Sequence, residues 1–159
     1  CLSLSGCSTN THSNNLDSFW FTKEEFRNEY ANIMMQCPNV TAVAHSDNGF
    51  DRITNPTSQP FINDELSKLY VIYPIENNHI SIVSYMSDTY LDYLEESTQT
   101  MLAIVYLCNP SINNDYDKAL DILTKTFDAA IRNKGYKHHR VKYHVNILKD
   151  TIIFSASIG

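Results

Sequence analysis

The feature that most constrains the fold is the alternation of apolar and polar residues from Val141 to Ile158. Successive side chains of a β-strand point to opposite faces of a sheet, so this pattern predicts two strands that each bury one face. If Lys149-Asp150 is a two-residue turn, the apolar side chains of the two strands meet in cross-strand pairs. The pairs are Ile147–Ile152, Val145–Phe154, Tyr143–Ala156 and Val141–Ile158. A slip of one residue would remove every pair, so the register is predicted too, although Lys-Asp is not a favoured type I′ turn and a longer loop is the alternative.

A second hairpin is predicted between residues 69 and 86, where β-branched and aromatic residues lie on both sides of Asn77-Asn78. Asparagine tolerates the positive φ angles of a type I′ turn. This turn would set Tyr73 opposite Ile82. Because Pro74 cannot donate a backbone hydrogen bond, its strand is expected to lie at an edge of the sheet or to carry a bulge.

Three segments have apolar residues at helical spacing and recognisable ends. They cover about residues 22 to 36, 87 to 107 and 115 to 133. In the first segment Thr22 and Glu25 are spaced as a capping box, in which each side chain accepts a hydrogen bond from the other residue's backbone N–H. Gly135 is expected to supply the left-handed residue that ends the third helix.

The order of these elements indicates the fold class. Residues 40 to 44 are a candidate short strand, and the rest of residues 39 to 66 is rich in Asn, Asp, Ser and Pro and is expected to be mostly irregular. Helix, short strand, hairpin, helix, helix and hairpin together are typical of an α+β fold, with an antiparallel sheet of about four strands and about three helices packed on one face. Residues 19 to 159 are expected to form a single globular domain.

Composition excludes some classes of partner. The formal net charge is −6, and nucleic-acid affinity depends largely on Lys and Arg that displace counterions, so no nucleic acid is expected to bind. The chain has only four glycines, which disfavours the Gly-rich phosphate loops of nucleotide-binding proteins. No catalytic motif is recognisable, and no cofactor or metal is expected.

The N-terminal residues Leu4-Ser5-Gly6-Cys7 carry a specific motif. They resemble the bacterial lipobox, in which Leu, two small residues and Cys mark the end of an exported signal peptide. The resemblance covers these four residues and implies cleavage before Cys7, a diacylglycerol on its thiol and an acyl chain such as palmitate on its new amine. Residues 1 to 6 would then be residual signal peptide, and the polar residues 8 to 18 a flexible tether.

A lipid anchor implies a location. Several acyl chains hold a protein stably at a membrane where one chain alone would be marginal. The chain is therefore expected to be anchored to the cell membrane or the outer membrane, with its domain in the periplasm or outside the cell. Thiols in these compartments tend to pair, so Cys37 and Cys108 are either a disulfide that closes a long loop or two buried free thiols.

A basic stripe is predicted on the penultimate strand. His138, Arg140, Lys142 and His144 are spaced by two and would project from one face of the sheet. This stripe would either bind an anionic group, more strongly below the ordinary histidine pKa of about 6.5, or be a solvated face that prevents aggregation. His139 would lie on the apolar face as a core histidine.

Three tyrosines of the predicted central hairpin are candidates for recognition. Tyr70, Tyr73 and Tyr85 would form either an exposed aromatic surface for a partner or part of the core beneath the helices.

The leading hypothesis for the function is a non-enzymatic protein-binding module of the cell envelope. It would be an immunity, exclusion or inhibitor lipoprotein, or an accessory of envelope assembly.

The alternative is a small periplasmic or extracellular hydrolase. Its site would be built from His45, Asp47 or Asp51 in the 45–52 loop, because loops often carry function. Adjacent residues do not make a catalytic triad, so this hypothesis requires these side chains to converge with His138 or His144 in a pocket.

Overall fold

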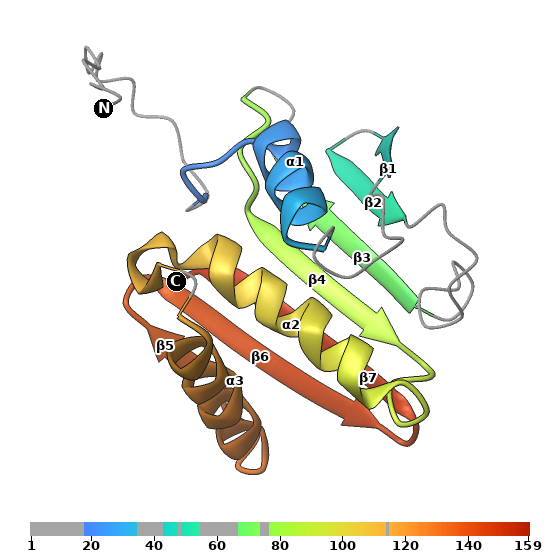
Figure 1. Cartoon of the computed structure of the whole chain (residues 1–159), viewed down its shortest axis with the longest axis vertical. Coiled ribbons are helices and arrows are strands. Elements are labelled where there is room, and N and C mark those ends of the chain that lie inside the picture. Colours follow the sequence, from blue (N-terminus) through green and yellow to red (C-terminus); the bar gives the residue numbers. More distant parts are fainter. Residues whose placement is uncertain (1–17, 35–42, 48, 55–66, 74–76, 114) are drawn as a thin grey trace.

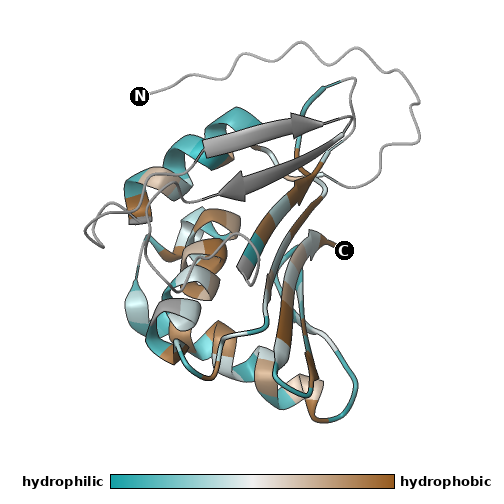
Figure 2. Ribbon diagram, turned by 90° about the vertical axis from the view of Figure 1, so that its right-hand side faces the viewer, coloured by the Kyte–Doolittle hydropathy of each residue, from teal (hydrophilic) through white to brown (hydrophobic). Residues whose placement is uncertain are grey.

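The computed structural model describes residues 18–34, 43–47, 49–54, 67–73, 77–113 and 115–159. Over these residues the chain has an α+β fold, in which helices cover one face of an antiparallel sheet (Figures 1 and 2). The helices are α1 (Lys23–Met34), α2 (Leu94–Cys108) and α3 (Tyr116–Ala130), and a short 3-10 turn, η2 (Pro110–Ile112), follows α2. The predicted fold class is confirmed.

The strands of the described part pair in the order β1-β2-β3-β4-β7-β6-β5. They are β1 (Val43–Asp47), β2 (Phe50–Thr54), β3 (Ser67–Ile72), β4 (Ile82–Ser87), β5 (Tyr136–His138), β6 (Val141–Leu148) and β7 (Thr151–Ile158). The two predicted hairpins would give four strands, but the same part of the chain forms five, β3 to β7. The additional strand is β5, which is separate from β6. The hairpin β1–β2, which turns through Gly49 at a φ of 81°, occupies residues 43–54, beyond the short strand expected at 40–44 and where irregular chain was expected; residues 39–42 and 55–66 lie outside the described residues.

The C-terminal hairpin has the predicted register. Each apolar pair expected between β6 and β7 is present, from Val141 opposite Ile158 to Ile147 opposite Ile152. The turn at Lys149-Asp150 is two residues long, and Lys149 adopts a positive φ of 57°. The alternation of residues and the short turn determine the pairing together.

The central hairpin differs from its prediction by one residue. Ile82 lies opposite Ile72 rather than Tyr73, and β3 is an interior strand paired with both β2 and β4. The reason is that the chain between the strands pairs elsewhere: Ile80 accepts a backbone hydrogen bond from Phe19 at 2.7 Å and donates one to Phe21 at 3.2 Å. This leaves no two-residue turn at Asn77-Asn78. Pro74 lies outside the described residues.

The sequence predicts helices that start near residues 22, 87 and 115, and the first and third of these starts are confirmed. The Thr22–Glu25 capping box is formed, with both hydrogen bonds at 3.2 Å, and the side chain of Asp115 accepts from the backbone N–H of Lys118 at the start of α3. Helix α2 begins at Leu94 and not near residue 87. Buried Ser87 instead accepts a hydrogen bond from the backbone of Thr89, within the turn that precedes the helix.

The left-handed residue after α3 is also not the one expected. Asn133 has a φ of 54°, and asparagine tolerates this conformation. Gly135 has a different role, because a Cβ atom there would lie 2.5 Å from Cε1 of the His144 ring. The glycine therefore allows the segment before β5 to approach His144 closely.

The core lies between the helices and the sheet. The inward side chains of β4, β6 and β7 alternate with exposed or half-buried ones and belong to the same buried cluster as the apolar residues of the helices. The largest fully buried side chains include Tyr143, Phe19, Phe26 and Phe154. Among the described residues, no helix has the length and apolar character needed to cross a membrane.

Candidate binding groove between α1 and α2

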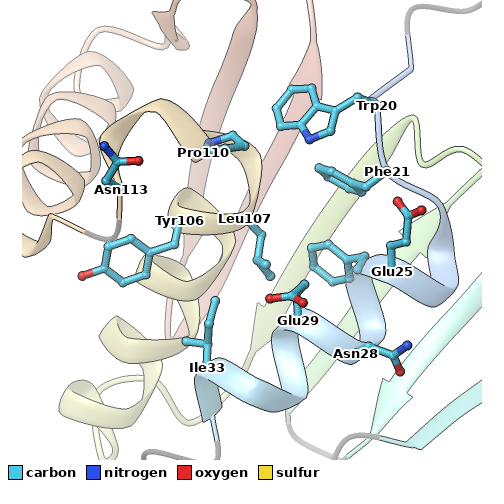
Figure 3. A pocket seen from close by; sticks show the side chains of 11 residues that line it. Trp20, Phe21, Glu25, Asn28, Glu29, Ile33, Tyr106, Leu107, Pro110 and Asn113 are labelled. Atoms are coloured by element: carbon cyan, nitrogen blue, oxygen red, sulfur yellow. The ribbon is translucent and has the colours of Figure 1, made fainter. Parts of the chain in front are cut away.

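A groove of about 590 Å³ runs between α1 and the end of α2. The residues before α1, α1 itself, the last turn of α2 and the η2 region each contribute part of its lining (Figure 3). Leu107 near the end of α2 and Ile33 of α1 point toward one another across it, whereas Tyr106 points away from α1. Such a volume lies within the range of about 300–1,000 Å³ that is usual for ligand sites.

Trp20 stands at one end of the groove and is 52% exposed, whereas its neighbours Phe19 and Phe21 are buried. The reason is local: residues 19 and 21 form backbone hydrogen bonds with Ile80 in the manner of a strand, so the side chain between them points the other way. The Trp20 ring lies edge-on to both phenylalanines, with centroids 5.8 and 5.3 Å away. Trp20 is therefore an exposed aromatic side chain that packs against two buried aromatic rings.

Two carboxylates line the α1 side of the groove. Glu25 and Glu29 are four residues apart and therefore lie on the same side of the helix (Figure 3). The capping box holds the Glu25 carboxylate, which accepts from the backbone N–H of Thr22. The described residues that line the groove include no Lys, Arg or His.

The apolar part of the groove comes from Phe26, Ile33 and Leu107, with Tyr106 and Pro110 beside them. Burial, aided by the nearby Tyr116 and Asp115, raises the pKa of the Tyr106 phenol above its ordinary value. The phenol is therefore neutral at physiological pH. An apolar floor with a few polar groups at its rim is the usual composition of a binding site.

Trp20 also borders a second hollow, of about 440 Å³, on the side of β6. Cys108 and Asn109 line it, together with His139 and Arg140 of the turn between β5 and β6. Cys108 carries a free, fully buried thiol, and burial raises its pKa far above the ordinary value. The thiol therefore stays protonated and is a poor nucleophile. The structure shows no disulfide at Cys108, and Cys37 lies outside the described residues, so a bond between the two stays a prediction.

The predicted basic stripe is divided by a turn. His139 has a φ of 52°, and the chain reverses at His139-Arg140 between β5 and β6. Lys142 and His144 do share the open face of β6, but His138 lies opposite Val141, on the face that α3 covers. The prediction of one continuous strand was wrong, because a residue with positive φ can turn the chain where the spacing suggested extension.

The histidines of this region have perturbed environments. Burial lowers the pKa of His144, and the positive charge of the neighbouring Lys142 lowers it further. Burial also lowers the pKa of His138, and the neighbouring His139 makes the second contribution in the same direction. His139 is exposed and edge-on to His138, with centroids 4.4 Å apart, and is not the core histidine that was expected.

The three tyrosines do not form one exposed surface. Tyr73 and Tyr85 are buried beneath the helices, at 5% and 2% exposed, and Tyr70 is half-buried on the other face of the sheet. The hydroxyl of Tyr85 donates to Ser97 at 3.1 Å, and that of Tyr73 accepts from Lys23 at 2.9 Å. The alternative of packing beneath the helices is correct for two of the three.

The residues of the hydrolase hypothesis lie far from the histidines they would need. His45 and Asp47 are on β1 and Asp51 is on β2, at the opposite edge of the sheet from β5 and β6 (Figure 1). Four strand spacings separate β2 from β6, which is about 19 Å at ~4.8 Å each. The predicted convergence with His138 or His144 does not occur. The described residues also contain no cluster of three or more His, Cys, Asp or Glu suited to a metal ion.

The sequence did not single out the groove. Its only local signals were the run Phe19-Trp20-Phe21 and the carboxylates of the first helix, and the partners of these residues on α2 lie about eighty residues further along the chain. The lipobox residues and residues 8 to 17 of the polar stretch lie outside the described residues. No protein-family model, curated protein or solved structure matches the chain.

Proposed function

We propose that the chain is a lipid-anchored protein of the bacterial cell envelope whose globular domain binds another protein through the groove between α1 and α2. The observation that carries this proposal is Trp20, half exposed on a base of buried phenylalanines beside an apolar hollow. Exposed, immobilised tryptophans are among the residues that contribute most to protein–protein binding, because they bury a large area at little cost in side-chain entropy.

The anchor proposed at Cys7 would keep this groove near the membrane. Trp20 follows Cys7 by only thirteen residues, which span at most about 45 Å even when fully extended. A partner would therefore be a protein that is itself in, or passing close to, that membrane. Within this class an immunity, exclusion or inhibitor protein and an accessory of envelope assembly both fit, and the domain would act by occupying its partner rather than by chemistry.

The experiment is site-specific photo-crosslinking in cells that make the full-length protein. A photoreactive amino acid replaces Trp20, and in the control it replaces Thr124, an exposed residue of α3 outside both hollows. We expect a discrete crosslinked protein from position 20 and none from position 124. Identical products from both positions, or none from position 20, would contradict the proposal.

The anchor has its own test. Mass spectrometry of the native protein should find an N-terminal Cys7 that carries the mass of the lipid. An unmodified Cys7 would refute the anchor and would leave the groove as a binding site without a membrane address.

A further inference from the structure

The charge of the groove is one-sided. Glu25 and Glu29 line it, and the described lining contains no basic side chain. The nearest lysine in sequence, Lys23, is turned toward the sheet: its Nζ donates to the Tyr73 hydroxyl at 2.9 Å and lies 4.5 Å from the centre of that ring. A ligand in the groove therefore meets two carboxylates and no basic side chain of the described lining.

The basic residues of the chain are concentrated after α2. Eight of its twelve Lys and Arg residues fall between positions 118 and 149, on α3 and the strands that follow. They are Lys118, Lys125, Arg132, Lys134, Lys137, Arg140, Lys142 and Lys149. Lys23 and Arg27 lie on α1, and Arg140 lines the neighbouring hollow that Trp20 also borders, but none of the three lines the groove. The groove thus lies in the part of the chain that carries most of the acidic residues, and its own described lining adds two carboxylates and no cation.

The apolar part of the groove complements this charge. Trp20, Ile33 and Leu107 can cover a bulky aliphatic or aromatic side chain, and the exposed Trp20 ring can also receive a cation on its face. Because the capping box already holds Glu25, less side-chain entropy is lost when this carboxylate pairs with a ligand.

From this arrangement we infer that the groove binds a basic peptide segment of the partner protein, one in which Lys or Arg flanks a bulky apolar residue. The inference rests on the proposed function and names the chemistry of the partner's contact segment. The apolar side chain enters the groove between α1 and α2, and the cations pair with Glu25 and Glu29.

The test uses the intrinsic fluorescence of Trp20, which is the only tryptophan of the chain. The full chain is titrated with a short blocked peptide in which Lys and Leu alternate, and separately with the same peptide carrying Glu for Lys. We expect a saturable change with the Lys peptide that weakens as salt is added, and none with the Glu peptide.

Two double variants separate the groove from general charge attraction. Glu25→Gln with Glu29→Gln removes both carboxylates but keeps the capping box, since glutamine also serves at that position. We expect it to bind the Lys peptide about fivefold more weakly. Glu24→Gln with Asp128→Asn removes the same charge outside the groove and should leave the affinity unchanged.

The contrary outcomes are specific. Equal binding of both peptides, or equal weakening by both double variants, would refute a groove selective for basic segments. If phosphatidylglycerol vesicles shift the Trp20 fluorescence and the peptides do not, the occupant is the lipid surface and the inference is wrong. If neither peptide binds but the crosslink from position 20 is found, this inference is wrong and the proposed function is still supported. If the crosslink is not found, the proposed function itself is contradicted.

Discussion

The side-chain amide of Asn109 donates a hydrogen bond to the hydroxyl of Tyr143 and so joins the end of α2 to the middle of β6. The same amide donates to the backbone carbonyl of Val105 at 2.8 Å. Both residues are buried, with Asn109 4% and Tyr143 0% exposed. The pair therefore satisfies polar groups that have little access to water, beside the hollow that Trp20 borders.

Replacing Tyr143 by Phe should destabilise the domain. The variant removes the acceptor and leaves an amide N–H of Asn109 buried without a partner, so we expect the free energy of unfolding to fall by about 1–3 kcal/mol. Urea unfolding followed by Trp20 fluorescence measures the change. Tyr116→Phe removes an exposed hydroxyl, and its free energy of unfolding should stay within about 0.5 kcal/mol of the parent value. An equal loss of stability in both variants would show that the Asn109–Tyr143 hydrogen bond is not the cause.

The capping box should stabilise α1 and thereby one wall of the groove. Thr22→Ala removes the oxygen that accepts from the Glu25 backbone, and we expect it to cost about 1 kcal/mol of unfolding free energy. Hydrogen exchange of the first turn of α1 should accelerate in parallel. Thr22→Ser keeps the hydroxyl and should behave like the parent, and a loss of the same size in this variant would contradict the explanation.

Lys149 offers a stabilising substitution. Its φ of 57° is unfavourable for a residue with a Cβ atom and costs glycine little. Relief of the left-handed conformation is worth about 1–2 kcal/mol. The greater freedom of glycine in the unfolded chain offsets about 0.5–1 kcal/mol of this, so we expect Lys149→Gly to raise the free energy of unfolding by about 0.5–1 kcal/mol. Asp150→Gly, at a position without positive φ, should give no gain, so an equal gain from both variants would mean that the turn conformation is not the cause.

Cys108 should resist alkylation in the folded protein. Burial raises its pKa, so the reactive thiolate is scarce even at mildly alkaline pH, and the sulfur is fully covered. Mass spectrometry after treatment with iodoacetamide should find Cys108 unmodified in the native protein and modified in urea. If it stays unmodified in urea until a reductant is added, the predicted disulfide with Cys37 is present instead of the free thiol.

The pKa values of His138 and His144 should make the domain less stable in mild acid. Both are lower in the folded protein than the ordinary value of 6.5, so the unfolded chain binds more protons below that pH. Their contribution to stability is present above pH 6.5 and is lost as the pH falls through the folded pKa values. The effect should be small because both groups are partly exposed, and it should appear as a lower urea midpoint at pH 5 than at pH 7.5. A variant with glutamine at both positions should flatten this difference, and an unchanged pH profile would disprove the assignment.

Local patterns were enough to predict several elements. The alternation from Val141 to Ile158, with a turn too short to allow a slip, determined the β6–β7 hairpin and its register. The Thr22–Glu25 spacing determined the start of α1, and Asp115 the start of α3. Each of these features depends on residues only a few positions apart, or on strands joined by a tight turn, so the necessary partners are visible in the chain itself.

The tertiary structure decided what depends on distant segments. Ile80 pairs with Phe19 and Phe21, which shifts the β3–β4 register by one residue and turns Trp20 outward. The positive φ of His139 divides the basic stripe between two strands. The groove exists only because α1 packs beside the end of α2, far away in sequence. Periodicity shows which face of a segment is buried, but not which other segment covers that face. For this physical reason the sequence indicated the secondary-structure elements and the candidate anchor. The candidate site arises only from the packing of distant segments.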